Sequence, residues 1–144
     1  MSLKPNNELS IILPVYNEHD NLKFLIPQLA KLSKELLHKY EILVVDDDST
    51  DETDKLIENL QKKYTNLRYI KRIINRSLPL SILEGIKRSK FKNTLWLDAD
   101  GSMDINSVEL LIREFIEDET KYYIGSRFVN GGGYKGQDSQ QNSV

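Results

Sequence analysis

Two clusters of carboxylates are the residues of this sequence best suited to do chemistry. Asp98-Ala99-Asp100 directly follows the apolar segment 94–97, and the turn-forming Gly101 comes next. Alternate residues of an extended segment point to opposite sides, so a turn is needed if both carboxylates are to meet one ion. Paired carboxylates are hard oxygen ligands that suit Mg²⁺ or Mn²⁺ bridging a diphosphate. An isolated Asp-x-Asp can instead cap a turn, but its position after an apolar strand favours a metal site.

The acidic cluster at 46–51 has several interpretations. A carboxylate there could bind the imino group of a pyrimidine or guanine base, or a ribose hydroxyl. Clustered acids also bind Mg²⁺ in receiver domains, and Ser49 or Asp51 could simply cap the next helix. A receiver domain needs a phosphoacceptor Asp at the end of its third strand, and the segment 69–72 contains none. The cluster alone leaves nucleoside and phosphoacceptor roles open, and the missing Asp counts against the second.

Two arginines, Arg76 and Arg127, follow predicted strands and are expected near the same edge of the molecule. A guanidinium group can hold a phosphate by paired hydrogen bonds. A single arginine is more commonly a solvated surface residue. His19 and His38 receive no role, since lone histidines are more often surface or packing residues.

The segments around these residues alternate between short apolar runs and helical patterns. Strands are predicted at 9–13, 41–45, 67–70, 94–97 and 122–125, and their continuous apolar character is typical of a sheet covered on both faces. Four helical stripes between them are interpreted as core faces: Leu22 to Leu36, Leu56 to Tyr64, Leu80 with Leu83 and Ile86, and Val108 to Ile116. The predicted helix starts are Asp20 or Asn21, Pro79 and Asp104. Strict alternation predicts a doubly wound α/β domain with a mainly parallel sheet.

Parallel strands bring their carboxyl ends to one edge of the sheet, where ligands bind. Each polar cluster follows a predicted strand, at 14–18, 46–49, 72–79 and 98–102. The active site is therefore expected at that edge.

Composition excludes several classes of protein. The chain has 144 residues, 39% of them hydrophobic, which fits a single globular domain. A formal net charge of −2 counts against broad nucleic-acid binding, so no nucleic-acid partner is expected. The absence of cysteine excludes a disulfide framework, a thiolate zinc site and a Cys nucleophile. No Gly-x-Gly-x-x-Gly follows the first strand and no P-loop motif occurs, which removes the main support for dinucleotide oxidoreductases and P-loop NTPases.

The predicted domain spans residues 9–129, between an N-terminal tail at 1–8 and a flexible Gly-rich tail at 130–144. The apolar runs are far shorter than the ~20 residues that cross a bilayer, and the start does not resemble a signal peptide. We therefore expect a cytoplasmic protein, and peripheral attachment to the cytoplasmic face of a membrane stays open. A sheet that stops after its fifth strand is short for a complete enzyme. It would leave an uncovered edge through which the chain could self-associate.

Taken in order, these motifs resemble those of the family 2 glycosyltransferases. The segment LSIILPVYNE at 9–18 resembles their opening strand and donor-binding turn, and VDDDSTD at 45–51 resembles their second signature. Asp98-Ala99-Asp100 matches their metal-binding motif. Gly125-Ser126-Arg127-Phe128, followed by Gly131 to Gly133, resembles the dolichol- or polyprenyl-phosphate mannosyltransferase branch. The resemblance runs from about Leu9 to Tyr134.

The resemblance implies a GT-A fold and a metal-dependent, inverting transfer of a hexose, mannose in this branch. The donor would be a nucleoside-diphosphate sugar, GDP-mannose before UDP-glucose. The acceptor would be a lipid phosphate such as dolichyl or polyprenyl phosphate at a membrane surface. The implied donor-binding residues are Pro14, Tyr16, Glu18 and Asp46 or Asp47, with Arg76 at the same edge; Asp98, Asp100 and Ser102 would meet the Mg²⁺ or Mn²⁺, and Arg127 would contact phosphate.

The sequence departs from the family pattern in three places. Asp48 stands where the second signature commonly has Gly, and Ser102, a short neutral ligand, stands where this branch often has Gln near the metal. The segment 77–81 replaces a stretch that is usually Gly-rich. Relatives continue well past position 144, so the chain resembles an N-terminal half. Two other interpretations stay open: a donor-binding remnant without transferase activity, and a Mg²⁺-dependent receiver or phosphotransfer domain.

Overall fold

A computed structural model of the chain describes residues 7–102 and 104–118. Four strands and four helices alternate: β1 (Glu8–Val15), α1 (His19–Leu36), β2 (Lys39–Asp46), α2 (Thr53–Gln61), β3 (Leu67–Lys71), α3 (Leu78–Arg88), β4 (Thr94–Trp96) and α4 (Ile105–Glu117). All the strand pairs in the described ranges are parallel, in the order β3-β2-β1-β4. The parallel α/β fold is thus confirmed. The predicted fifth strand at 122–125, Arg127 and the tail at 130–144 lie outside the described residues.

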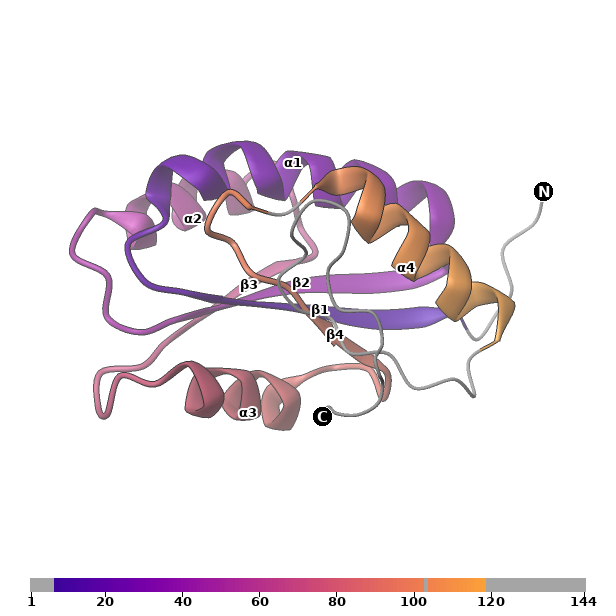
Figure 1. Cartoon of the computed structure of the whole chain (residues 1–144). Helices are drawn as coiled ribbons and strands as arrows, with labels where there is room; N and C mark the ends of the chain where they lie inside the picture. The colour runs from indigo at the N-terminus through magenta and orange to yellow at the C-terminus, as the bar shows by residue number, and fades with distance from the viewer. Residues whose placement is uncertain (1–6, 103, 119–144) are drawn as a thin grey trace.

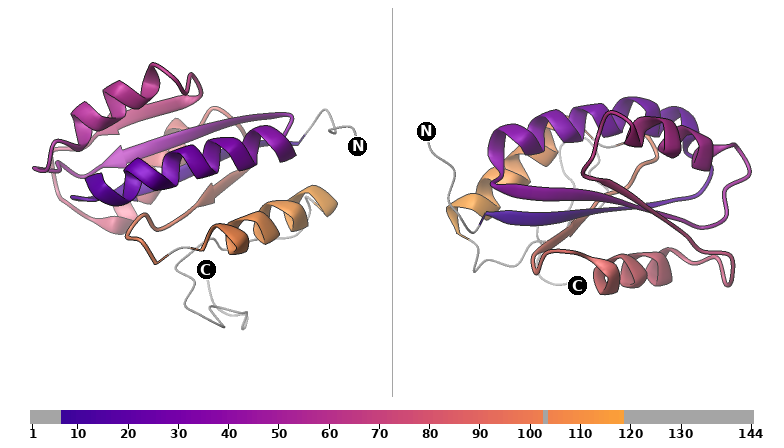
Figure 2. Two further views of the ribbon diagram at one scale, coloured as in Figure 1. Left: turned by 90° about the horizontal axis from the view of Figure 1, so that it is seen from above. Right: turned by 180° about the vertical axis from the view of Figure 1, so that it is seen from behind.

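Helices cover both faces of the sheet, but unequally. Figure 1 shows α1, α2 and α4 in one layer above the sheet and α3 below it, and the view from above in Figure 2 shows α2, α1 and α4 side by side. β1 serves both layers, because Ile11 and Leu13 belong to the larger core while Ile12, between them, belongs to the smaller. This explains the continuous apolar character of the strands.

Pro14 lies inside the central strand β1, where a residue without an N–H group is normally excluded. The Ser10 N–H donates to the Asn93 carbonyl, and the Ile12 carbonyl accepts from the Leu97 N–H, so even-numbered residues of β1 direct their backbone groups toward β4. Pairing with β4 ends at Ile12. Pro14 is the next even-numbered residue after Ile12 and lies beyond the last residue of β1 that pairs with β4. Its missing N–H group therefore interrupts no hydrogen bond between the two strands.

The interpretation of Leu80, Leu83 and Ile86 as a core face is wrong. These side chains are exposed, whereas the buried residues of α3 are Ser81 and Gly85. A Cβ atom at Gly85 would lie 2.6 Å from Cγ2 of Ile12, so only a residue without one lets the helix approach β1 this closely. Periodicity identified the apolar stripe correctly, but small residues on the opposite side turned that stripe outward.

The predicted helix starts at Pro79 and Asp104 are confirmed, whereas the start predicted at Asp20 or Asn21 is wrong. Ser77 caps α3 with Pro in the first turn, and the Asp104 carboxylate accepts from the Asn106 N–H at the start of α4. Helix α1 instead begins at His19, with Glu18 in the cap position and without a side-chain cap. In α2 the cap position is Glu52, although the Asp51 carboxylate still accepts from the Thr53 N–H and hydroxyl.

The buried carboxylate of Glu41 connects the strands near the amino-terminal edge of the sheet. Glu41 of β2 is 2% exposed and accepts hydrogen bonds from Ser10 of β1 (2.6 Å), from Arg68 of β3 (2.5 Å) and from the Lys90 N–H (2.6 Å). Burial alone would raise the pKa of Glu41, but these hydrogen bonds outweigh burial and lower it. The Ser10 hydroxyl also accepts from the Phe91 N–H. One side chain thus joins three strands to the segment that leads into β4.

Within the described ranges, no helix is both long and apolar enough to cross a bilayer.

Candidate functional site

The carboxyl ends of all four strands lie at one edge, because the strands are parallel. The loops that follow them carry every described non-glycine residue with a positive φ: Asn17, Asp48, Glu52 and Asn75. Gly101, in the loop after β4, has a φ of 87°. Backbone held in this region is costly and is found preferentially at functional sites. The conformational strain of the described chain is therefore concentrated at the edge where the sequence predicts the site.

Hydrogen bonds join the loop after β1 to the loop after β2. The Asn17 N–H donates to Ser49 Oγ (2.8 Å), and the Asn17 side-chain carbonyl accepts from the Thr50 N–H (2.8 Å). The His19 N–H donates to the Asp51 carboxylate at 3.0 Å. Asn17 uses both its backbone and its side chain, so its left-handed conformation is fixed from two directions. The two loops form one surface.

Asp46, the last residue of β2, is buried and has partners on both carboxylate oxygens. Oδ1 accepts from the Ser49 N–H (3.0 Å) and hydroxyl (2.5 Å), and Oδ2 accepts from the Tyr69 hydroxyl (2.5 Å). Burial, the hydrogen bond to Asp46 and nearby negative charges raise the pKa of Tyr69, so this hydroxyl stays a donor. Asp46 therefore sets the shape of the loop that follows it.

Asp47 fastens the loop between β3 and α3. Its carboxylate is ion-paired with the Arg72 guanidinium and accepts from the Ser77 N–H (2.9 Å) and the Ser81 hydroxyl (2.8 Å). Arg72 also donates to the carbonyls of Ile74 and Asn75, and so it holds the loop from within. Sequence reasoning gave Arg72 and Tyr69 no role. Arg72 directly follows a strand, and that position was the available signal.

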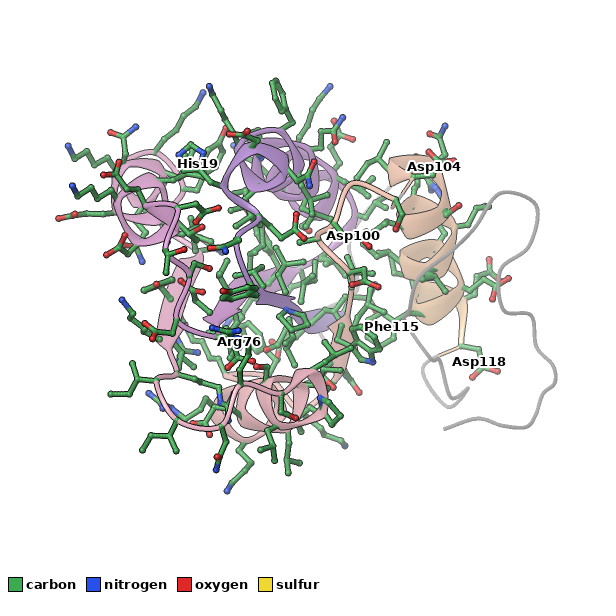
Figure 3. The ribbon with its side chains drawn as sticks, turned by 60° about the vertical axis from the view of Figure 1, so that its left-hand side comes forward. His19, Arg76, Asp100, Asp104, Phe115 and Asp118 are labelled. Atoms are coloured by element: carbon green, nitrogen blue, oxygen red, sulfur yellow. The ribbon has the colours of Figure 1, made fainter. Side chains whose placement is uncertain are left out.

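Tyr16 and Arg76 meet across the space between the first and third of these loops. The Arg76 guanidinium carbon lies 3.7 Å from the centroid of the Tyr16 ring, a cation–π contact. Figure 3 shows Arg76 between α3 and the strand ends. The structure thus brings together an aromatic face and a cation that the sequence places 60 residues apart.

Asp98 and Asp100 act on Glu18 through their charges. Burial raises the pKa of Glu18, an Asn21 hydrogen bond (2.7 Å) opposes this, and the negative charges of Asp100, Asp98 and Asp51 raise it further. The loop after β4 also packs closely on the start of α1, since a Cβ atom at Gly101 would lie 2.9 Å from Oδ1 of Asn21. Carboxylates from three loops therefore gather on one side of the β1 end, and Figure 3 shows Asp100 on the segment that leads into α4.

This concentration of negative charge fits a divalent cation. Carboxylate oxygens are the ligands that Mg²⁺ and Mn²⁺ prefer, and Mg²⁺ is commonly held by one or two carboxylates together with substrate phosphates. Ser102 lies beside Asp100, to which its N–H (3.0 Å) and hydroxyl (2.6 Å) both donate. Among the described residues, no group of three or more His, Cys, Asp or Glu is arranged to hold a metal ion. The pair Asp98 and Asp100 is accordingly compatible with an ion shared with a phosphate ligand.

Of the predicted site residues, the structure gathers two groups at this edge. The first comprises Pro14, Tyr16, Arg76, Asp46 and Asp47, and the second comprises Glu18, Asp98, Asp100 and Ser102. Pro14, Asp46 and Asp47 are buried, whereas Tyr16, Arg76, Asp100 and Ser102 are exposed.

Comparison with known proteins adds independent findings. Residues 10–143 match the family described as "Glycosyl transferase family 2". The chain is 34% identical over 125 residues to the dolichol-phosphate mannosyltransferase of Pyrococcus furiosus, covering 87% of this chain and 34% of that protein. It is 33% identical over 132 residues to the dolichyl-phosphate beta-glucosyltransferase of Dictyostelium discoideum, covering 85% and 40%. The chain thus spans well under half the length of these relatives.

Among solved structures, the chain superimposes on the mannosyltransferase of Pyrobaculum calidifontis in complex with GDP-Man and Mn²⁺. The TM-score is 0.57 at 18% identity, with 76% of this chain and 34% of the other covered. At this identity the likeness shows the fold alone. It agrees with the parallel sheet described above.

Proposed function

Because the chain belongs to glycosyl transferase family 2, we propose that it forms the nucleotide-sugar site of a glycosyltransferase. The proposed reaction moves a hexose from a nucleoside-diphosphate sugar to a lipid phosphate such as dolichyl or polyprenyl phosphate. The observation that carries the proposal is the gathering of Glu18, Asp98 and Asp100 beside Tyr16 and Arg76 at the carboxyl edge. Acid on one side and an aromatic–cation pair on the other suit a ligand with a diphosphate and a base.

Asp98 and Asp100 would hold Mg²⁺ or Mn²⁺, with Ser102 next to them. A divalent ion held by these residues would supply positive charge that stabilises a diphosphate leaving group. The carboxylates contribute by fixing where that charge stands before the reaction begins. Arg127, outside the described residues, is proposed to contact phosphate as well.

The nucleoside would lie against the loops after β1 and β2. The Tyr16 ring offers an aromatic face for a base, and the Arg76 guanidinium beside it could bind phosphate or stack on the same base. Pro14 and Glu18 flank Tyr16 in sequence. Asp46 and Asp47 stay predicted contacts of the base or ribose, and each would make that contact while keeping the loop hydrogen bonds described above.

We propose a lipid-phosphate acceptor from the names of the relatives. A phosphate monoester has a second pKa of about 6, so it is mostly anionic at neutral pH and attacks without a strong general base. A single displacement inverts the anomeric centre. GDP-mannose is the favoured donor and UDP-glucose the next, in line with the mannosyl and glucosyl relatives. Localisation at the cytoplasmic face of a membrane stays a prediction.

A second candidate is a donor-binding chain that transfers no sugar by itself. The observation that favours it is the coverage of only 34% and 40% of the two relatives. The residues that position an acceptor could lie in the parts of the relatives that the chain does not cover. A receiver-type phosphotransfer function is disfavoured by the family and by the absence of Asp at the end of β3.

Calorimetric titration tests the proposed function. GDP and UDP should bind the chain in the presence of Mn²⁺ or Mg²⁺, and Asp98→Asn or Asp100→Asn should weaken that binding at least about tenfold through lost metal coordination. Asp104→Asn is the matched control, because Asn caps a helix as well as Asp does. Unchanged diphosphate affinity in EDTA would overturn the metal assignment.

A second arm separates the nucleoside contacts from the metal. Asp46→Ala and Asp47→Ala should weaken binding of the nucleoside monophosphate as well as the diphosphate. If both variants lose only diphosphate binding, these acids belong to the metal site instead. Circular dichroism on the same samples reports whether the helices and strands of the fold are kept.

A further inference from the structure

Helix α3 directs its large apolar side chains away from the sheet. Leu80, Leu83 and Ile86 are 41%, 51% and 46% exposed, while Ser81 and Gly85 face β1 and β2. Figures 1 and 2 show α3 as the sole described helix on its side of the sheet. An isolated exposed leucine is ordinary, but a helix whose apolar side points outward marks a surface that another phase or molecule covers.

The loop before α3 extends this apolar surface. Ile73 and Ile74 are 71% and 70% exposed, and Leu78 is 46% exposed. Nine large hydrophobic side chains are exposed in the described part, and six of them lie between residues 73 and 86. We call these six the α3 surface: Ile73, Ile74, Leu78, Leu80, Leu83 and Ile86. The remaining three are distributed over other elements, so the α3 surface is a true concentration.

Basic residues flank the α3 surface at both ends. Between positions 71 and 92 the sequence has seven Lys or Arg and a single acidic residue, Glu84, although the whole chain has a net charge of −2. Glu84 is ion-paired with Arg88, and Lys87, Lys90 and Lys92 are exposed. Lys71 and Arg72 are ion-paired with Asp48 and Asp47, so the exposed positive charge of this segment lies mainly at and beyond the end of α3, in Lys87, Lys90 and Lys92.

We propose that the α3 surface docks on an anionic lipid bilayer. Exposed Leu and Ile side chains flanked by Lys and Arg match a membrane interface, which takes up apolar groups and attracts cations. The choice of a bilayer rests on the proposed function, whose acceptor is a lipid phosphate. The same loop that carries Ile73 and Ile74 carries Arg76, which contacts Tyr16 at the carboxyl edge. Docking on the α3 surface would therefore bring the candidate site close to the lipid headgroups.

Vesicle co-sedimentation in the absence of any nucleotide tests the proposal. The chain should sediment with vesicles of phosphatidylglycerol and phosphatidylcholine, less with phosphatidylcholine alone, and less at high salt. Leu83→Gln should weaken binding about tenfold, since it removes one inserting aliphatic side chain. Replacing Lys87, Lys90 and Lys92 together by Gln should weaken it about fivefold per charge.

Phe24→Gln on α1 and Leu110→Gln on α4 are matched controls. These side chains are 69% and 65% exposed on the opposite layer of the molecule, so vesicle binding should not change. Circular dichroism and urea unfolding establish that every variant keeps its fold.

Equal binding by all variants, or no binding by the natural chain, would overturn the proposal. Self-association that Leu83→Gln abolishes would make the α3 surface an interface between copies instead. Vesicle binding that persists while GDP and UDP fail to bind would reject the proposed function alone.

Discussion

Asp48 adopts a φ of 66°, a conformation that costs an L-residue with a Cβ atom about 1–2 kcal/mol unless its side chain compensates locally. Its carboxylate forms an exposed ion pair with Lys71 at 3.6 Å, which contributes little. We expect Asp48→Gly to be at least as stable as the natural chain and Asp48→Ala to be about 1–2 kcal/mol less stable than Asp48→Gly. Urea unfolding of the three chains measures this order.

Glu58, exposed within helix α2, provides the matched control for Asp48. There the backbone is right-handed helical, so Ala should exceed Gly in stability by about 1 kcal/mol, the reverse order. The same order at both positions would show that Asp48 is not strained.

The pKa of Glu18 is raised by burial and by the charges of Asp100 and Asp98, against the opposing effect of Asn21. When the pKa of a carboxyl group is higher in the folded state than in the unfolded state, the folded state loses stability as pH rises through that pKa. We therefore expect Glu18→Gln to be more stable than the natural chain at pH 7, with a difference that shrinks at about pH 4. Urea unfolding at both pH values measures the difference.

The substitution Asp51→Asn should change the free energy of unfolding at pH 7 in the opposite direction to Glu18→Gln. Burial would raise the pKa of Asp51, but hydrogen bonds from Thr53 and from the His19 N–H outweigh burial and lower it. Its carboxylate stabilises the fold above the ordinary pKa, and this contribution is lost as pH falls. Asp51→Asn should therefore be less stable than the natural chain at pH 7, with a smaller difference in acid. Parallel pH profiles for Glu18→Gln and Asp51→Asn would contradict at least one of the two assignments.

At the scale of elements, the contact of α3 with β1 depends on Gly85. Ala for Gly inside a helix normally stabilises by about 1 kcal/mol, but here the new Cβ would lie 2.6 Å from the fully buried Ile12 side chain. We expect Gly85→Ala to destabilise the chain by about 1–3 kcal/mol, the range for overpacking. Thermal or urea unfolding provides the measurement.

A double-mutant cycle with Ile12→Ala tests the cause. Removing the Ile12 side chain opens the space that the methyl group introduced by Gly85→Ala needs, so the two substitutions together should cost less than the sum of their separate effects. If the two changes in the free energy of unfolding are strictly additive, the cost of Gly85→Ala does not come from its contact with Ile12.

Sequence reasoning predicted the four described strands and the edge where their polar ends meet, because apolar runs and polar strand ends are local features. The side of α3 that faces the sheet was not predictable in this way. An apolar stripe shows that one side of a helix is more apolar than the other, but it does not show which side packs on the sheet. Ser81 and Gly85 decide this through close packing on the sheet, a tertiary contact. The partners of Asp46 and Asp47 were missed for the same reason: Tyr69 and Arg72 lie more than 20 residues away.

At the scale of the whole molecule, donor binding and sugar transfer should separate. The described residues that we propose to bind the donor lie together at the carboxyl edge, whereas the chain covers only 34% and 40% of two relatives that are named as transferases. We expect the chain to bind a nucleoside diphosphate with Mn²⁺ but to transfer sugar to a polyprenyl phosphate poorly. Calorimetry and a radiolabelled-sugar transfer assay on one sample provide both readouts.

Sedimentation of that sample examines the predicted association through a sheet edge. Among the described strands, β4 is the end strand next to β1. The association is predicted through the sheet edge beyond the expected fifth strand at 122–125, which lies outside the described residues. Concentration-dependent association is expected. Efficient transfer by a stable monomer would contradict both whole-molecule predictions.

The hydrogen bonds that join Glu41 and Ser10 to residues 90 and 91 constrain the order in which this chain can fold. The Phe91 N–H donates to the Ser10 hydroxyl across 81 residues, and Lys90 supplies a donor to the same buried carboxylate. Contacts this distant in sequence are formed late, because the entropy of closing so long a loop is lost before they contribute. A nascent chain on the ribosome therefore holds its central strand, β1, without one of its two neighbours until residues 90–96 have emerged. During that interval one side of β1 has no partner strand, and unpaired strand edges are prone to mispairing and aggregation.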